Sequence, residues 1–240
     1  MSTEFTALPL GAGDLHRGQQ LTRSNPRVSR LAKPTRLLAA VCDSFDPRCE
    51  RIRALRTELL VRHASGEQAL VIALLSPGTG DGRSQLAAEL AISFAQLNRP
   101  TLLVDADLRY PRQHLLFAAD NKLGLSQAIE QCLMPYLQPI EGLRHLSLLT
   151  SGPTPDNALE LLLNKRLALL VEEWRKSFDF VVLDTAPTAH YSDGLAVASL
   201  VKRVLVLSRA RHTPCKDIRD VLRRLAAMRS QVVGAVINHF

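Results

Sequence analysis

The stretch that decides the fold is residues 69–84, which read ALVIALL followed by SPGTGDGRS. The first seven residues form an uninterrupted apolar run, which is typical of a buried strand in a parallel sheet. Three glycines within the next seven residues permit a tight turn, and the segment from Ser84 to Leu97 has the pattern of a helix. A Gly-rich turn before a helix gathers backbone N–H groups at the positive end of the helix dipole. The stretch therefore predicts an anion-binding turn suited to phosphates.

The rest of the chain alternates between short apolar runs and longer amphipathic segments. Strands are expected at 101–105, 146–149, 180–183, 204–207 and 232–237, and helices at 48–63, 125–133, 158–177, 193–200 and 216–228. This alternation predicts an α/β fold, with a parallel, doubly wound sheet flanked by helices. In a chain of 240 residues, one such domain with a tail is the expected organisation.

Composition excludes several classes of protein. The chain is 46% hydrophobic and 22% charged, which disfavours collagen, coiled coil and wholesale disorder. No run approaches the ~20 apolar residues of a membrane helix, and no apolar segment near the start is typical of a signal peptide. The four cysteines form no metal-like pair. We therefore expect a cytoplasmic protein with reduced thiols.

The net charge of +7 is concentrated at the two ends of the chain, whereas residues 63–200 are acidic. Residues 1–44 are expected to form a flexible basic tail. A solvated tail without a partner is one interpretation, and attraction to an anionic membrane surface, at ~1 kcal/mol per Lys or Arg, is a second. Nucleic-acid binding is disfavoured because the tail has no aromatic residue after Phe5 to stack on bases.

Acidic residues follow two further predicted strands. In LLVDADLR (102–109), Asp105 and Asp107 follow the apolar residues of the predicted strand. In FVVLDTAP (180–187), Asp184 does the same. A carboxylate at the end of a buried strand needs a cation or water, and Mg²⁺ beside a nucleotide's phosphates is such a cation. Each loop alone also fits a polar turn that faces solvent. Together, the three strand ends predict a nucleotide site with Mg²⁺.

These motifs resemble those of a known family. From about Asp46 to Asn238, the chain resembles the cytoplasmic domain of bacterial tyrosine kinases of capsular and exopolysaccharide synthesis, within the MinD- and ParA-like P-loop ATPases. Residues 50–57 (ERIRALRT) resemble the family's Glu-x-x-Arg-x-x-Arg helix, and residues 152–162 (GPTPDNALELL) resemble the loop and helix after its fourth strand. Partition ATPases carry a lysine early in the phosphate loop, where this chain has Gly78.

The resemblance implies a P-loop domain over residues 45–240, with ATP and Mg²⁺ as cofactors. The nucleotide-binding residues would be Gly78, Thr79, Gly80, Asp81, Gly82, Arg83, Ser84 and Gln85. The metal ligands would be Ser84, Asp107 and Asp184, and the catalytic residues Asp105, Asp107 and Arg83. A helix over residues 45–63 would mediate homo-oligomer contacts through Glu50, Arg53 and Arg56, although a solvated helix surface is the alternative. The implied partner is the cytoplasmic tail of a membrane-embedded polysaccharide chain-length regulator, at the inner face of the plasma membrane.

Two departures from the family pattern bear on activity. Arg83 stands where the phosphate loop has lysine, and a planar guanidinium does not simply replace a compact ammonium. The sequence also ends directly after the last predicted strand, without the family's tyrosine cluster, and its tyrosines are Tyr110, Tyr136 and Tyr191. The expected function is an ATP-binding protein of the polysaccharide tyrosine-kinase type with attenuated activity. A nucleotide-dependent scaffold without catalysis is the alternative, and a partition-type ATPase is less favoured.

Overall fold

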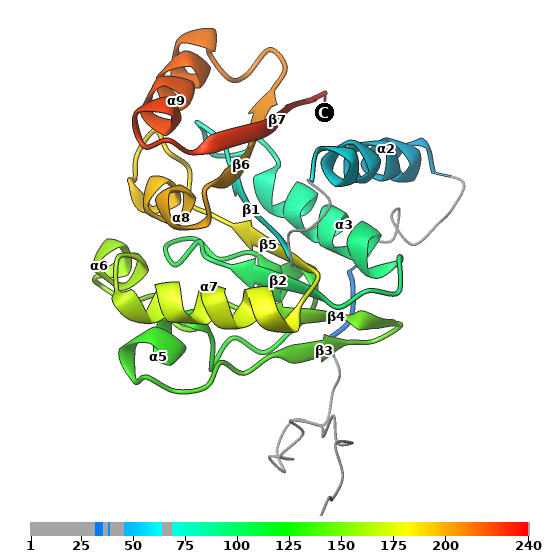
Figure 1. Ribbon diagram of the computed structural model, residues 1–240, viewed down its shortest axis with the longest axis vertical. Helices are drawn as coiled ribbons and strands as arrows, with labels where there is room; N and C mark the ends of the chain where they lie inside the picture. Colours follow the sequence, from blue (N-terminus) through cyan, green and yellow to red (C-terminus); the bar gives the residue numbers. More distant parts are fainter. Residues whose placement is uncertain (1–31, 36–37, 39–45, 64–68, 240) are drawn as a thin grey trace, which may run out of the picture. The chain divides into compact units, whose positions relative to one another are not determined.

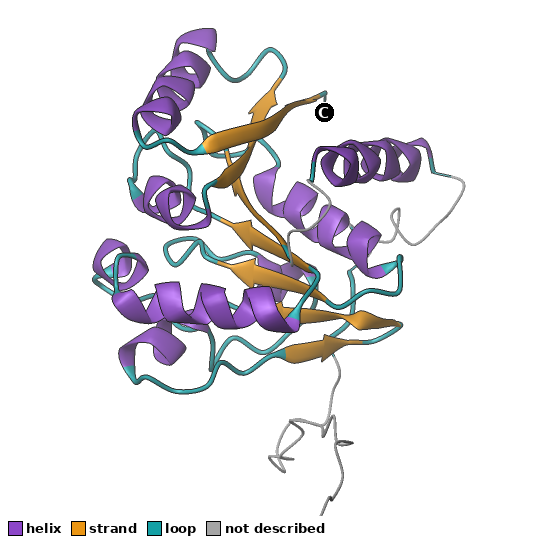
Figure 2. Cartoon of the chain, viewed as in Figure 1, coloured by secondary structure: helices purple, strands orange, loops and turns teal. Residues whose placement is uncertain are grey.

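A computed structural model describes residues 32–35, 38, 46–63 and 69–239, and shows a seven-stranded sheet covered by helices (Figures 1 and 2). The strands are β1 (Leu70–Leu75), β2 (Thr101–Asp105), β3 (Gln138–Ile140), β4 (Leu143–Leu149), β5 (Phe180–Asp184), β6 (Arg203–Arg209) and β7 (Gln231–Asn238). Their order is β3-β4-β2-β5-β1-β6-β7. Neighbouring strands are parallel except β3 and β4, which are antiparallel. The predicted α/β class is confirmed, with a sheet that is mostly parallel.

Helices cover both faces of this sheet. They are α2 (Pro47–Arg62), α3 (Arg83–Ala95), α4 (Gln113–Leu116), α5 (Leu125–Glu130), α6 (Ala158–Leu162), α7 (Lys165–Ser177), α8 (Asp193–Val201) and α9 (Cys215–Ala227). Alternate residues of β1 divide between two cores, because successive side chains of a strand point to opposite faces. Val71, Ala73 and Leu75 pack with α5 to α9, whereas Leu70, Ile72 and Leu74 pack with α2 and α3. Figure 1 shows these two helical layers on either side of the strands.

Two predicted elements need correction. The single helix expected over residues 158–177 is two helices, α6 and α7, separated at Leu163 and Asn164. The Asn164 side chain accepts a hydrogen bond from the N–H of Arg166 and so caps α7, while Leu163 is 63% exposed. The apolar spacing hid the break, because Leu163 fits the helical pattern without being buried. The strand β3 was not expected, and its antiparallel pairing with β4 departs from a wholly parallel sheet.

The helix expected at 48–63 is α2, which begins after Asp46. The Asp46 side chain accepts a hydrogen bond from the N–H of Arg48, and Pro47 fits the first turn. On the inner side of α2, Nε of Arg48 lies 2.8 Å from Oε1 of Glu89, which is fully buried on α3. This ion pair and the apolar contacts of Ile52 and Leu59 fix α2 against α3.

Part of the segment expected to be a flexible tail packs on this domain. Ala32 pairs with Ile140 of β3, and the N–H of Lys33 donates to the carbonyl of Phe117 at 2.6 Å. Ala32 and Leu38 are buried. The predicted boundary at residue 44 lies outside the described residues, as does most of the tail. Within the described residues, no helix is long and apolar enough to cross a membrane.

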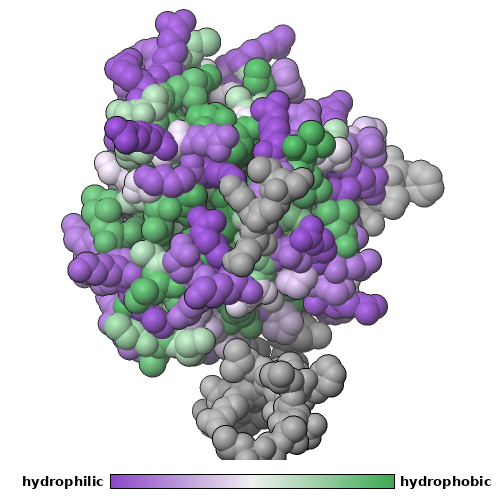
Figure 3. All heavy atoms as spheres, in the orientation of Figure 1, coloured by the Kyte–Doolittle hydropathy of each residue, from purple (hydrophilic) through white to green (hydrophobic). Residues whose placement is uncertain are grey.

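The surface is mixed in character (Figure 3). Hydrophilic residues gather over α9 at the top of the view, in agreement with the burial of only Val221 and Leu225 on that helix. Cys49, Cys132 and Cys215 are free thiols, and Cys42 lies outside the described residues.

Candidate nucleotide site

The three predicted site loops follow strands that are neighbours in the sheet. β5 lies between β2 and β1, so Asp184 emerges between Asp105 and the glycine-rich loop. Asp105 and Asp184 are register partners, and the N–H of Ala106 donates to the carbonyl of Asp184 at 2.8 Å. The carboxyl ends of these strands therefore bring all three loops to one edge of the sheet, which is where open α/β sheets bind ligands.

The glycine-rich loop has the backbone of an anion cradle. Gly80 and Gly82 have φ of +77° and +94°, a region that glycine adopts without strain. The backbone N–H groups of residues 79–82 donate to no other described residue, and α3 begins directly afterwards at Arg83. The loop lines a cavity of about 230 Å³ together with Arg112 and Leu116. These unpaired donors beside a helix N-terminus fit the phosphates of a nucleotide.

Asp81 holds the loop in shape and is buried. Its carboxylate accepts hydrogen bonds from the N–H of Gly78 at 2.9 Å and from the hydroxyl of Thr213 at 2.7 Å. The side-chain amide of Asn238, at the end of β7, donates to the Asp81 carbonyl at 2.9 Å. Asp81 therefore ties the loop to the ends of β6 and β7. Thr213 and Asn238 lie far from the motif in sequence and were not predicted to contact it.

Arg83 is 7% exposed and is turned into the cluster of carboxylates. Its Nη1 donates to the Ser76 hydroxyl at 2.6 Å, its Nη2 lies 3.3 Å from Oδ2 of Asp107, and its Nε lies 3.3 Å from Oδ1 of Asp184. The structure thus brings together Arg83, Asp107 and Asp184 as the sequence predicted. The guanidinium supplies the positive charge that two buried carboxylates require.

The three aspartates differ in their partners. Asp105 accepts hydrogen bonds from the backbone N–H groups of Arg112 and Gln113 at 3.0 and 2.9 Å, and so shapes the loop after β2. Burial raises the pKa of Asp105 well above its usual value, and the nearby charge of Asp184 adds to this increase. Burial also raises the pKa of Asp184, against the opposing effect of Arg83. Asp105 therefore makes structural contacts, whereas Asp107 and Asp184 contact the loop cation.

Gln113 belongs to the same cluster and was missed by sequence reasoning. Its Nε2 donates to Oδ2 of Asp184 at 2.8 Å and to the backbone carbonyl of Ser84 at 2.9 Å, and the residue is fully buried. It links the end of β5 to the first turn of α3. The side-chain Oε1 has no hydrogen-bond partner within the described residues. Gln113 lies in a short helix within a loop, where the sequence shows no periodicity. No pattern in the sequence therefore marked it as a site residue.

A second charged contact borders the site. Arg109 forms a two-point ion pair with Asp193 at the start of α8, with distances of 2.7 and 3.1 Å. The guanidinium lies 4.3 Å from the ring centre of Tyr191, whose hydroxyl is 3.3 Å from that of Tyr110. The hydrogen bond with Tyr110 raises the pKa of Tyr191. This group fixes the loop after Asp107 against the loop that leads into α8.

The residues expected to bind Mg²⁺ fit a hard cation in their chemistry. Ser84, Asp107 and Asp184 offer a hydroxyl and two carboxylates, the oxygen ligands that Mg²⁺ prefers. Among the described residues no group of three His, Cys, Asp or Glu side chains could hold a metal, in agreement with a set that contains only two such residues. In this arrangement Arg83 takes the cation's place between the carboxylates.

The three residues expected to mediate oligomer contacts do not share one environment. Glu50 and Arg53 pair with each other at 3.2 Å, and the Glu50 side chain is 76% exposed. Arg56 instead donates from Nη1 to the carbonyl of Ser93 on α3 at 2.7 Å. Burial and the charge of Arg53 lower its pKa. The role of Glu50, Arg53 and Arg56 in oligomerisation stays a prediction.

Comparison with known proteins identifies the family. The putative tyrosine-protein kinase CapB of Staphylococcus aureus is 32% identical over 191 residues, which span 79% of this chain and 83% of CapB. The tyrosine-protein kinase YwqD of Bacillus subtilis is 31% identical over 214 residues, which span 88% of this chain and 90% of YwqD. The chain belongs to the bacterial tyrosine-protein kinase family. No family model matches the chain.

Solved structures agree with this family assignment. The kinase domain of the Escherichia coli tyrosine kinase ETK matches with a TM-score of 0.80 and 27% identity, over 90% of this chain and 84% of that domain. The chimeric protein CapA2B2 matches with a TM-score of 0.78 and 26% identity, over 87% of this chain and 92% of that one. The cell-division ATPase MinD of Pyrococcus furiosus, at 18% identity and a TM-score of 0.60, shares the fold. The bacterial tyrosine-kinase domain is thus placed among P-loop ATPase folds.

Proposed function

We propose that this chain is an ATP-binding P-loop protein of the polysaccharide tyrosine-kinase type, with attenuated phosphoryl transfer or hydrolysis. The observation that carries the proposal is that a loop lined with backbone N–H groups lies beside two buried carboxylates, Asp107 and Asp184, which contact Arg83 of that loop. The loop supplies donors for phosphates, and Asp107 and Asp184 supply acceptors at the next two strand ends. Membership of the tyrosine-kinase family supports the same reaction class.

Each predicted residue has a role in this proposal. The backbone from Gly78 to Gln85 holds the phosphates, with Ser84, Asp107 and Asp184 as Mg²⁺ ligands. When bound, Mg²⁺ would offset the negative charge of the phosphates. Asp107, with Asp105 beside it, would accept the proton of an attacking hydroxyl or water. Arg83 would donate to the phosphates after it leaves the carboxylates.

The arginine is the reason for proposing attenuated activity. In its present position the guanidinium is held by Ser76, Asp107 and Asp184, so a nucleotide would have to exchange those contacts for its phosphates. Loss of one preorganised donor at the transition state lowers the rate by about 10²–10³-fold. Arg83 keeps the positive charge, so we take this range as the upper limit of the effect.

A second function is favoured by the same contacts. If Arg83 stays on the carboxylates when nucleotide is bound, the protein would act as a nucleotide-dependent scaffold without catalysis. In both cases the proposed partner is the cytoplasmic tail of a membrane-embedded chain-length regulator of capsule or exopolysaccharide assembly. We further propose a homo-oligomer at the inner face of the plasma membrane.

Titration with a fluorescent ATP analogue, with and without Mg²⁺, followed by measurement of phosphate release, tests the proposal. Binding with slow release that is abolished in Asp107→Asn supports the enzyme. Nucleotide-dependent assembly without release supports the scaffold. Failure to bind the Mg²⁺–nucleotide complex at millimolar concentration would refute both.

A further inference from the structure

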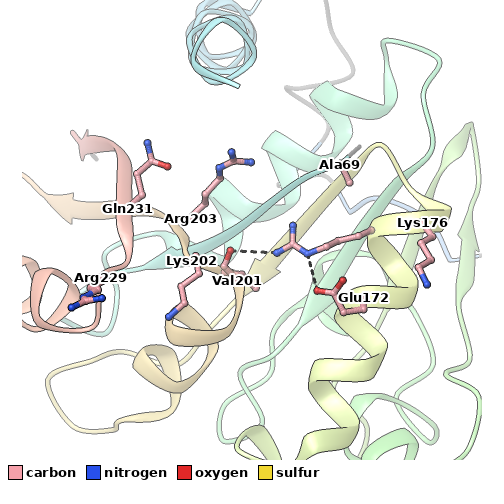
Figure 4. Close-up of a pocket in the computed structure, with 9 residues that line it drawn as sticks. Ala69, Glu172, Lys176, Val201, Lys202, Arg203, Arg229 and Gln231 are labelled. Carbon is pink, nitrogen blue, oxygen red and sulfur yellow. Dashed lines mark hydrogen bonds and ion pairs between the residues drawn. The ribbon is translucent and has the colours of Figure 1, made fainter. Parts of the chain in front are cut away.

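A second cavity lies at the opposite edge of the sheet, where β6 and β7 begin, and has a volume of about 540 Å³. It is formed by the end of α7, the start of β1, the junction of α8 and β6, and the turn before β7 (Figure 4). Five of its lining residues are basic, Arg175, Lys176, Lys202, Arg203 and Arg229, and one is acidic, Glu172. β6 separates this cavity from the nucleotide site by about 20 Å, the length of a seven-residue strand.

Some of these cations already have partners. Arg175 contacts Glu172 at 3.3 Å and the carbonyl of Val201 at 3.4 Å. Lys202 reaches the carbonyl of Met228 at 3.5 Å, and Arg203 lies 3.2 Å from Nδ1 of His63. These contacts explain the first two cations as partners of helix C-termini, where positive charge is stabilising.

Helix termini do not account for the whole charge. The C-termini of α7, α8 and α9 lie at this edge, and each carries the equivalent of about half a negative charge. Glu172 and two of these termini already contact Arg175 and Lys202. The side chains of Lys176 and Arg229 make no hydrogen bond or ion pair with the described residues. In Figure 4 these two side chains lie at opposite ends of the cavity.

Two of the cations stand at backbone positions that favour glycine. Lys202 has φ of +67° and Arg229 has φ of +54°, at the ends of α8 and α9. Residues with a side chain rarely adopt this region, and helices commonly end with glycine there. The chain therefore places a basic side chain at two positions where glycine would relieve backbone strain.

We propose that this cavity binds an anion that carries two or more phosphate groups. Lys176 and Arg229 provide a cation at each end of the cavity, and one phosphate group, which carries about −1.5 to −2, can contact each of them. The ligand must be extended, because Lys176 and Arg229 are separated by the width of the cavity. A peptide fits less well, since Ala69 and Val201 are the apolar residues of the lining and offer little surface to side chains. The proposal does not depend on nucleotide binding at the other edge.

Lysine acetylation of the full chain, read by mass spectrometry at low salt, tests the proposal with inorganic pyrophosphate as the probe. The candidate phosphate loop contains no lysine, so protection of Lys176 and Lys202 does not come from a ligand bound in that loop. We expect pyrophosphate to slow acetylation of Lys176 and Lys202 at least fivefold, while Lys122 and Lys165 react as before. Equal reactivity of all four lysines with and without pyrophosphate, and with vesicles, would overturn the proposal.

The double variant Lys202→Gly/Arg229→Gly separates binding from stability. The pyrophosphate concentration that protects Lys176 should rise at least tenfold in this variant, while its melting temperature holds or rises. Arg211→Gly is the matched control, because Arg211 also has a positive φ (+60°) but does not line the cavity. Unchanged protection of Lys176 in the double variant contradicts the proposal.

Vesicles distinguish two sources of the phosphate groups. If vesicles of phosphatidic acid protect both lysines and vesicles of phosphatidylcholine do not, the phosphate groups are those of neighbouring lipid headgroups. If only pyrophosphate protects them, the ligand is a free phosphate compound. Either result supports the cavity as a phosphate site, provided that Lys202→Gly/Arg229→Gly weakens the protection of Lys176.

Discussion

The guanidinium of Arg83 lies 3.3 Å from the carboxylate of Asp184, and both side chains are buried. The Arg83 side chain is therefore held by carboxylates at the ends of the neighbouring strands and does not extend over the glycine-rich loop. A buried charge that loses its partner is strongly destabilised, so Arg83 can leave Asp184 only when another cation takes its place. In the proposed enzyme, nucleotide binding is thus expected to exchange one cation for another, whereas in the proposed scaffold Arg83 keeps its contacts.

The first prediction follows from this exchange. Arg83→Lys replaces a three-contact guanidinium by a single ammonium, which cannot contact Ser76, Asp107 and Asp184 together. If the proposed activity is correct, phosphate release should increase, by at most about 10²–10³-fold. Steady-state release at saturating Mg²⁺–ATP measures the change, and nucleotide affinity is the control. Unchanged release with intact binding would favour the scaffold.

The second prediction concerns Asp105 and pH. Its pKa is raised in the folded protein, so its favourable contribution is complete below the ordinary value of 3.8 and is lost as pH rises through the raised value. Asp105→Asn cannot ionise and escapes this loss. We expect the variant to be less stable than the parent at acid pH, because one acceptor of backbone N–H groups is removed, and the difference to shrink as pH rises.

Denaturant unfolding across the acid to neutral range measures this difference. Asp156→Asn, at an exposed position, is the control and should give a profile parallel to that of the parent. A profile for Asp105→Asn that also runs parallel would show that Asp105 titrates normally in the folded state.

The third prediction concerns the close contact of two loops beside the sheet. A Cβ on Gly124 would lie 2.1 Å from the N atom of Gly152 and 2.4 Å from the carbonyl oxygen of Thr150. These are backbone atoms and cannot move aside, so Gly124→Ala should lower the free energy of unfolding by about 3 kcal/mol. Chemical denaturation measures the loss.

Gly142→Ala provides the comparison for this effect. Gly142 has φ of +78°, but a Cβ there meets no atom within 4 Å. Its substitution should cost only the backbone strain, about 1 kcal/mol. Equal losses in the two variants would mean that steric overlap is not the cause.

Elements with a clear apolar pattern were predictable from the sequence. β1, β2 and β5 are buried on both faces and therefore have continuous apolar sequences. The aspartates that follow β2 and β5 were placed at one edge because parallel strands end together. The partners of those aspartates were not predictable. Gln113 reaches Asp184 only through the path of the chain after β2, and Thr213 and Asn238 reach Asp81 from strands distant in sequence.

Local features of the chain explain why the α6–α7 break and the strand β3 were not predicted. The break between α6 and α7 depends on the side-chain cap of Asn164, which competes with a leucine pattern that runs through it. β3 has three residues, one of them Pro139, and lies at the edge of the sheet, where proline is tolerated. Neither feature produces a period that a sequence window can detect.

The last prediction tests how α2 is attached. Arg48 contacts both oxygens of Glu89, at 2.8 and 3.0 Å, and Glu89 is fully buried while the Arg48 side chain is 32% exposed. Arg48→Met would leave the buried carboxylate with Gln85, which donates to it at 3.0 Å. Because that donor remains and Arg48 is partly exposed, we expect a loss of about 2 kcal/mol, below the 3–5 kcal/mol of a fully buried pair.

Two further variants serve as comparisons for Arg48→Met. Arg51→Met, at an exposed position of the same helix, should change the free energy of unfolding by less than about 0.5 kcal/mol. Arg48→Met/Glu89→Leu removes the buried charge as well, so it should recover part of the loss seen in Arg48→Met. A double variant less stable than Arg48→Met would show that Glu89 stabilises α3 by itself, and the attachment of α2 would then rest on the packing of Ile52 and Leu59.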